Sequence, residues 1–233
     1  MVNLKVKFQD LGLIEYQKAW DYQEKLFQNV VAVKQKNRNT KQDNDTPNYL
    51  LFCEHPHVYT LGKSGKESNL LINEDFLKNK GASLVKTNRG GDITYHGPGQ
   101  IVGYPILDLN NFSLSIKSYI FKLEEVIIGC LKQFGVNSSR STGATGVWLD
   151  ADNPAISRKI CAIGVRTSHW VSMHGFALNV NTDLNYFEYI VPCGIVGKSV
   201  TSISRELGKK ISTEEVKQVL KREFSNVFEM ELN

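Results

Sequence analysis

Residues 89–100 read Arg-Gly-Gly-Asp-Ile-Thr-Tyr-His-Gly-Pro-Gly-Gln and lead into the apolar segment 101–109. Four glycines and a proline fall within these twelve residues. Glycine suits positions where the backbone needs a positive φ or where a ligand must approach the main chain. Proline stiffens the turn that contains it. The stretch therefore predicts a rigid backbone cradle for a ligand, with Arg89 and His96 at its borders, although a glycine-rich hairpin would share this composition.

The segments around this stretch predict several helices. Apolar residues recur with helical spacing over 13–33 and 113–134, and the second helix ends at Gly135. A shorter helix is expected over 70–80 and a C-terminal one over 212–228, where Ser212 and Glu215 form a capping-box pattern. The polar segment 34–48 has no periodicity and predicts a mobile surface loop.

Strand patterns fill the middle of the chain. They are expected at 49–53, 58–61, 101–109, 146–149, 159–167 and 171–180. In the last of these, alternation places His174, Phe176, Leu178 and Val180 on one face. Strands clustered centrally between helices predict an α/β or α+β fold around a mixed, largely antiparallel sheet. The length suits one large domain over residues 1–233, or one domain with a small appendage.

Composition excludes several classes of protein. A net charge of +4 without a basic stripe argues against nucleic-acid binding. Apolar runs are too short for a membrane span, and no secretory signal is recognisable, so the expected location is the cytoplasm. The four cysteines include no C-x-x-C pair. Cys53, His55 and His57 alternate, but Pro56 interrupts them, so a structural role is favoured and no metal site is predicted.

One cysteine differs from the others in its setting. Cys53, Cys130 and Cys161 lie inside apolar runs, where a thiol is usually an inert small hydrophobe. Cys193 lies between Pro192 and Gly194, outside any periodic segment. Such a turn gives access to the sulfur and offers backbone N–H groups for a developing oxyanion, which favours a nucleophile at this position.

A nucleophilic thiol also needs a neighbouring cation or base that lowers its pKa. Five candidates stand elsewhere in the chain: Lys159, His96, His174, Arg166 and Lys198. Lys159 opens an apolar strand, and an ammonium directed from there into a cleft would favour the thiolate. A solvated lysine at a strand end is the alternative interpretation.

At this point the motifs become recognisable. Residues 54–62, the stretch 89–100, Arg158-Lys159-Ile160-x-Ala162-Ile163-Gly164, residues 174–179 and Pro192-Cys193-Gly194-Ile195 follow one another in order. Together they resemble the ordered motifs of the lipoyl(octanoyl) transferase family. The resemblance implies the fold shared by the biotin protein ligase and lipoate ligase catalytic domains.

The resemblance also implies an activity and its partners. Members of this family take an octanoyl group from the phosphopantetheine thioester of acyl carrier protein. They pass it to a lysine on lipoyl domains of 2-oxoacid dehydrogenase complexes or on the glycine-cleavage H protein, through an acyl thioester on cysteine. No cofactor is implied, since the octanoyl group arrives as substrate. We further expect a monomer.

By the same resemblance, Cys193 is the expected nucleophile and Lys159 lowers its pKa. The implied substrate-binding residues come from three motifs: Arg89, Gly90, Gly91, Asp92, Ile93, Thr94, Tyr95 and His96, then Ala162, Ile163 and Gly164, and finally Gly175, Phe176 and Ala177. Strand alternation would place Cys161 on the face of Lys159, which leaves open a second thiol near the site.

Three alternatives to this function stay open. One is a cysteine acyltransferase that uses a different donor or relays octanoyl between carriers. An ATP-dependent lipoate or octanoate ligase would share the scaffold, but it has no need of the Pro-Cys-Gly turn. A binding module that docks acyl carrier proteins without catalysis would need neither Lys159 nor Cys193.

Overall fold

The computed structural model describes residues 3–41, 44–191 and 199–233. In the described residues the strands form two sheets, one of nine strands and one of three. The large sheet has the order β12-β1-β2-β6-β10-β9-β8-β7, with β11 paired to β9. Its strands are β1 (Lys5–Leu13), β2 (Asn48–Glu54), β6 (Gln100–Ile106), β7 (Ser139–Ser141), β8 (Ala144–Leu149), β9 (Arg158–Ser168), β10 (Val171–Asn179), β11 (Ser199–Val200) and β12 (Glu231–Leu232).

The small sheet has the order β4-β3-β5. It consists of β3 (Val58–Leu61), β4 (Ser83–Lys86) and β5 (Ile93–His96). The helices are α1 (Tyr16–Thr40), α2 (Glu74–Asn79), α3 (Ile116–Gln133), α4 (Ile203–Leu207) and α5 (Thr213–Phe228), with short 3₁₀ turns η1 (Glu67–Asn69) and η2 (Leu184–Tyr189). In the described part, no helix is long and apolar enough to cross a membrane.

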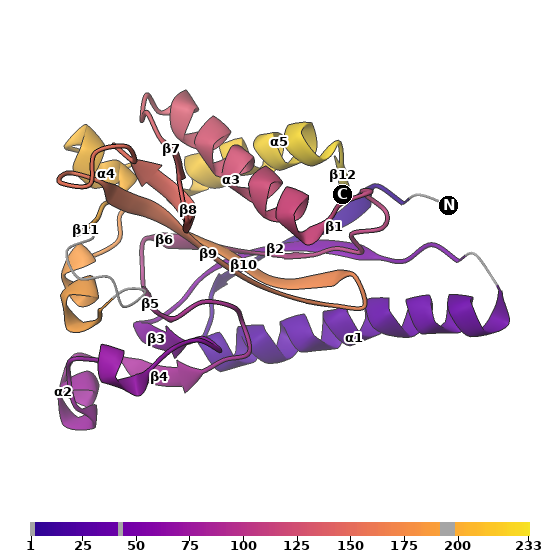
Figure 1. Ribbon diagram of the computed structural model, residues 1–233, viewed down its shortest axis with the longest axis horizontal. Helices are drawn as coiled ribbons and strands as arrows, with labels where there is room; N and C mark the ends of the chain where they lie inside the picture. The colour runs from indigo at the N-terminus through magenta and orange to yellow at the C-terminus, as the bar shows by residue number, and fades with distance from the viewer. Residues whose placement is uncertain (1–2, 42–43, 192–198) are drawn as a thin grey trace.

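Helices cover both faces of the large sheet. Helix α1 crosses one face, whereas α3 and α5 lie side by side on the other (Figure 1). The small sheet and α2 form a separate edge of the molecule beside the N-terminal half of α1 (Figure 1). The pairings β1–β2, β1–β12 and β9–β11 are parallel and the remaining ones in the large sheet are antiparallel. The prediction of a mixed, largely antiparallel sheet flanked by helices is therefore confirmed.

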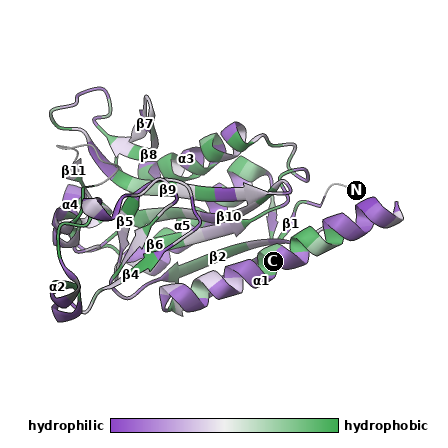
Figure 2. Cartoon of the chain, turned by 60° about the horizontal axis from the view of Figure 1, so that its bottom comes forward, coloured by the Kyte–Doolittle hydropathy of each residue, from purple (hydrophilic) through white to green (hydrophobic). Residues whose placement is uncertain are grey.

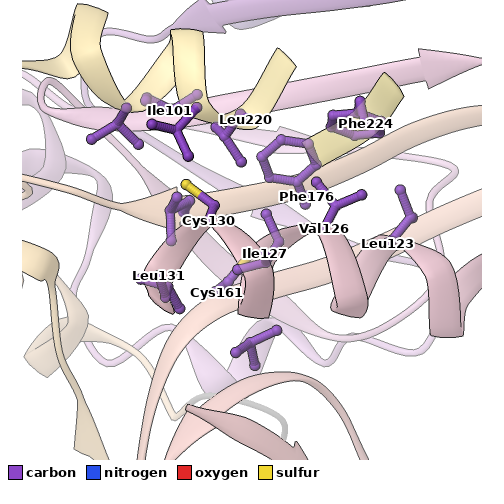
Figure 3. Packing of buried hydrophobic residues seen from close by; sticks show 14 of the residues in the cluster. Ile101, Leu123, Val126, Ile127, Cys130, Leu131, Cys161, Phe176, Leu220 and Phe224 are labelled. Atoms are coloured by element: carbon purple, nitrogen blue, oxygen red, sulfur yellow. The ribbon is translucent and has the colours of Figure 1, made fainter. Parts of the chain in front are cut away.

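The larger hydrophobic core lies between the sheet and the α3–α5 pair. Apolar side chains from α3, α5 and the strands meet there, including Ile127, Leu220 and Phe176 (Figure 3). A second core joins α1 to the opposite sheet face, and a third lies around the small sheet and η2. The side chains of α1 that pack on the sheet include Ala19, Phe27 and Val30. Figure 2 shows green in the middle of this helix and purple at its C-terminal end.

Helix α1 corrects one sequence expectation. The segment 34–48 was expected to be a loop, but the helix continues to Thr40 and ends at Lys41, whose φ is 54°. The Lys34 ammonium forms an ion pair with the buried Asp108 carboxylate, and Thr40 Oγ1 donates to the Lys36 carbonyl at 2.8 Å. Because Asp108 lies far along the chain, this contact has no signature in the local periodicity.

The other helix expectations hold with shifted ends. Ser212 caps α5 by accepting a hydrogen bond from the Glu215 N–H at 3.3 Å. The helix expected over 70–80 is shorter, because Asn73 accepts from the Phe76 N–H and sets the first residue of α2 at Glu74.

Candidate active site

A cavity of about 510 Å³ lies where the glycine stretch meets the large sheet. Its wall is built from α1, the glycine stretch, β6, α3, β8, β9, β10, η2 and residues 199–200. Exposed residues 143 and 145 stand at one end, beside Lys159, and the buried His174 stands at the other. The distance along β9 from Lys159 to Val165 is about 20 Å of extended strand. The cavity is thus an elongated slot with an outer rim at Lys159.

The structure brings most of the predicted site residues to this cavity. Those in its wall are Arg89, Gly90, Gly91, Asp92, Ile93, Thr94, His96, Lys159, Ala162, Ile163, Gly164, Gly175, Phe176 and Ala177. Cys193 lies outside the described residues, as do Pro192, Gly194, Ile195 and Lys198.

Tyr95 is the predicted residue that does not line the cavity. Its ring is buried in the core of the small sheet, stacked on Tyr186 at 4.9 Å. Its hydroxyl lies 2.7 Å from His57 Nδ1. The side chains of β5 alternate, so Thr94 and His96 face the cavity whereas Tyr95 turns toward η2.

Arg89 is a buried cation fixed by the small sheet. Its Nη2 donates to the Thr60 carbonyl at 2.6 Å and to Thr60 Oγ1 at 2.9 Å, and its Nη1 donates to the Gly90 carbonyl at 3.0 Å. The next residue joins the loop to the large sheet, because the Gly90 N–H donates to the Val165 carbonyl at 3.0 Å. A Cβ on Gly164 would lie 3.0 Å from the Gly90 carbonyl oxygen, so this approach of two backbones depends on glycine.

A chain of buried polar groups crosses the cavity wall from His96. His96 Nδ1 lies 2.8 Å from Gln100 Oε1, and Gln100 Nε2 donates to Asn179 Oδ1 at 2.9 Å. Asn179 Nδ2 in turn donates to the Thr201 carbonyl at 3.0 Å. Burial, and secondly the charges of His55 and Arg89, hold the pKa of His96 well below its usual range. His96 is therefore neutral at physiological pH and acts as a hydrogen-bonding group.

His174 lies on the opposite sheet face from the one that alternation predicts. Its φ is +59°, and it contacts Trp20 of α1 and Asn88, with Nε2 2.6 Å from Asn88 Oδ1. Phe176 and Leu178 pack on the α3–α5 side as expected. The left-handed conformation at His174 reverses the direction of its side chain, which the pattern could not show. Burial, and secondly the charges of the nearby Arg89 and Arg166, lower its pKa to about 3.

Lys159 stands in the wall with its ammonium at the rim. Nζ donates to the Thr145 carbonyl at 3.2 Å and lies 4.6 Å from the ring centroid of Trp148. Its backbone carbonyl accepts from the Thr201 N–H at 2.9 Å, because β11 pairs with this end of β9. Lys159 thus lies in the wall of the cavity, and its effect on the thiol of Cys193 stays a prediction.

A β-bulge separates Lys159 from Cys161 and corrects another expectation. Val147 pairs with Cys161 and the next residue, Trp148, pairs with Lys159, so Ile160 is the extra residue. Ile160 and Cys161 both pack into the core beneath α3, where Figure 3 labels Cys161 among apolar side chains. Cys161 therefore does not share the cavity face of Lys159, and it contributes no second thiol to the site.

The described cysteines are all buried. Burial raises the pKa values of the thiols of Cys53, Cys130 and Cys161, and each is inaccessible. Cys53 Sγ lies 3.5 Å from His55 Nε2, which also contacts the Tyr104 hydroxyl at 2.7 Å. The polar atoms of Cys53, His55 and Tyr104 thus contact one another inside the core. This arrangement agrees with the structural role expected for Cys53 and His55.

The described residues on both sides of 192–198 are held by backbone contacts. On the upstream side, the Val191 N–H donates to the Asn69 carbonyl at 2.8 Å, and Asn69 Nδ2 donates to Asp92 of the glycine stretch at 2.6 Å. On the downstream side, Ser199 and Val200 pair with Arg158 and Lys159. Ser199 and Val200 also line the cavity.

Sequence reasoning missed several residues of the wall. Tyr16 of α1 stacks on His96 at 5.8 Å, and burial raises its pKa to about 12. Trp148 and Asn179 also line the cavity. Trp148 lies in the strand expected over 146–149, so its position in a strand could be predicted. The sheet face of its side chain depends on the bulge in β9, which the sequence does not show.

Comparison with known proteins gives the class of this fold and site. The model of the lipoyl protein ligase A/B catalytic domain matches residues 15–225. A bi-partite lipoate protein ligase from Thermoplasma acidophilum has a similar structure, with a TM-score of 0.68 at 15% identity, covering 100% of this chain and 86% of that one. The chain belongs to the lipoyl protein ligase A/B catalytic domain family.

Curated relatives are more specific. The chain is 58% identical to a Flavobacterium johnsoniae protein over 232 residues, covering 99% of this chain and 100% of that one. It is 57% identical to a Flavobacterium psychrophilum protein over 229 residues, covering 98% of each. Both relatives are named octanoyltransferase. These similarities confirm the resemblance that the ordered motifs indicated.

Proposed function

We propose that this chain is an acyltransferase that moves an octanoyl group from acyl carrier protein to a lysine of a lipoyl domain or of the glycine-cleavage H protein. The observation that carries the proposal is the near full-length similarity to octanoyltransferases, together with a slot that gathers the predicted acyl-binding residues beside Lys159. Fold alone would not distinguish transfer from ATP-dependent ligation.

We propose Cys193 as the nucleophile. Support comes from the three other cysteines, whose burial and raised pKa values leave them unreactive. Further support comes from Val191 and Ser199, which tie the two ends of the intervening segment to Asn69, beside the glycine stretch, and to β9.

In the proposed reaction the Cys193 thiolate attacks the carbonyl carbon of the incoming octanoyl thioester. The carbon–sulfur bond to phosphopantetheine breaks, and the Lys159 ammonium gives its proton to the departing carrier sulfur, which leaves Lys159 as the neutral amine. The acceptor lysine amine then attacks the cysteine thioester, forms an amide and releases the cysteine sulfur. Lys159 favours the thiolate by its charge in the first half, and in the second half it accepts the proton from the attacking amine.

The slot supplies the binding energy for the acyl chain. Ala162, Gly164 and Gly175 line the slot, and Val102 and Phe176 make its surface apolar. About seven carbons beyond the carbonyl, at about 0.8 kcal/mol each, correspond to about 5–6 kcal/mol of transfer free energy. Burial of the chain can therefore anchor the substrate without a charged headgroup.

Intact-protein mass spectrometry with octanoyl-acyl carrier protein tests the proposal. Wild-type protein should gain one octanoyl group and lose it when a lipoyl domain is added, without ATP. Cys193→Ser should abolish transfer, while Cys130→Ala, which alters a buried thiol in the core, is the matched control. Acylation that needs ATP and survives Cys193→Ser would instead support a lipoate or octanoate ligase.

A further inference from the structure

We propose that Trp148 is a positioning residue for the transfer reaction, because its indole face holds the Lys159 ammonium at the rim of the slot. This inference rests on the proposed function. Its structural basis lies entirely within β8 and β9, among described residues.

The bulge in β9 creates the pair. With Ile160 as the extra residue, Trp148 stands directly opposite Lys159 across the two strands. Directly opposed residues project from the same sheet face, and both of these side chains line the cavity. Bulges commonly redirect a side chain next to an active site. Without this bulge, Lys159 would share the face of Cys161, which packs into the core.

The indole ring lies on one side of the ammonium. Lys159 Nζ is 4.6 Å from the ring centroid, within the range in which a cation is attracted to the negative face of an aromatic ring. The same Nζ donates to the Thr145 carbonyl at 3.2 Å. Both contacts favour the protonated amine, and together they restrict a long and otherwise mobile side chain.

Trp148 is itself held rigidly. It is 2% exposed, and its Nε1 donates to the Ala144 carbonyl at 3.1 Å. The neighbouring Gly146 N–H donates to the buried Glu124 carboxylate at 3.0 Å, and Arg140 Nε contacts the same carboxylate at 3.1 Å.

The backbone at position 146 also leaves no space for a side chain, so glycine is needed there. Its φ is +119°, and a Cβ there would lie 2.5 Å from the Cys161 carbonyl oxygen. The strand that carries Trp148 is therefore fixed against both α3 and β9.

A graded series of substitutions tests the role of the ring face. Trp148→Phe keeps a weaker aromatic face, whereas Trp148→Leu keeps an apolar side chain without one. Trp170→Leu, on the half-exposed turn between β9 and β10, is the matched control. Circular dichroism and thermal melting establish that each variant is folded. If Trp148→Leu does not fold, Trp148→Phe and Trp148→Tyr provide the comparison with wild type.

The first readout needs no substrate. Acetic anhydride acetylates only the neutral amine, so its rate at Lys159, followed by peptide mass spectrometry, reports how strongly the protonated form is held. We expect the rate to rise about 3- to 30-fold in Trp148→Leu and by a smaller factor in Trp148→Phe. Trp170→Leu should label as wild type does.

The second readout is octanoyl transfer. The value of kcat/KM should fall about 3- to 30-fold in Trp148→Leu, with a smaller loss in Trp148→Phe. The proposal would be overturned if folded Trp148→Leu had the wild-type acetylation rate at Lys159 and the wild-type kcat/KM. It would also be overturned if Trp148→Phe and Trp148→Leu changed these values equally. Failure of the proposed function would give a different result. Cys193→Ser would then still transfer the octanoyl group, while the acetylation rate of Lys159 would still differ between the Trp148 variants.

Discussion

The buried histidines predict that the fold loses stability in mild acid. His55 and His174 are 0% and 1% exposed, and burial lowers their pKa values to about 4 and about 3 from 6.5. The unfolded chain therefore binds more protons than the folded one below pH 6.5. Stability falls as the pH falls from there toward the folded pKa values.

The size of the effect follows from proton linkage. At about pH 5, protonation of each histidine in the unfolded chain is worth about 2 kcal/mol, so the two together remove about 4 kcal/mol relative to neutral pH. His96, whose pKa is also lowered, acts in the same direction. This loss is a large part of the stability of an ordinary domain.

Urea denaturation at about pH 7 and about pH 5 measures the effect. The difference in unfolding free energy between the two pH values should shrink by about 2 kcal/mol in His174→Gln, whatever that variant costs at neutral pH. His169→Gln, on the exposed turn after β9, should keep the wild-type difference. A wild-type protein equally stable at both pH values, or a His174→Gln variant with an unchanged difference, would refute the reasoning.

Three further predictions concern packing, the long helix and the slot. Gly175→Ala would place a Cβ 2.2 Å from the Gly103 carbonyl oxygen, so urea denaturation should show a loss of about 1–3 kcal/mol. Lys34→Met leaves the buried Asp108 carboxylate without its cation and should cost about 3 kcal/mol, whereas the exposed Lys36→Met should cost little; equal effects would contradict the ion pair. A hexanoyl donor lacks two buried methylenes, so kcat/KM should fall about 15-fold relative to octanoyl, and an equal value would contradict an apolar slot.

The sequence predicted the elements whose signals are local. Periodicity located α3 and α5, and Ser212 marked the start of α5. The order of the motifs located the cavity, because most of their residues line it. A glycine-rich stretch that leads into a strand can be recognised from the sequence alone, because it does not depend on contacts with distant parts of the chain.

The errors arise where a distant contact or a backbone irregularity decides the outcome. The end of α1 depends on Lys34 reaching Asp108. The face of His174 depends on its positive φ, and the face of Cys161 depends on the extra residue Ile160. Period-two alternation carries no information about any of these.

Tyr95 shows a different limit. The motif that contains it does form the cavity, yet its side chain belongs to the aromatic core that holds η2 against the small sheet. A motif identifies a segment that matters, whereas the direction of each side chain decides what that residue does. The roles of Cys193 as nucleophile, the cytoplasmic location and the monomeric state stay predictions.

The rate of thiol alkylation as a function of pH is the most direct test of the pairing of Lys159 with Cys193. Iodoacetamide should modify Cys193 in the wild-type protein with a midpoint well below that of an ordinary cysteine. Lys159→Met should raise this midpoint by about 1–3 pH units, because the neighbouring positive charge is gone. An identical midpoint in the two proteins would contradict the account.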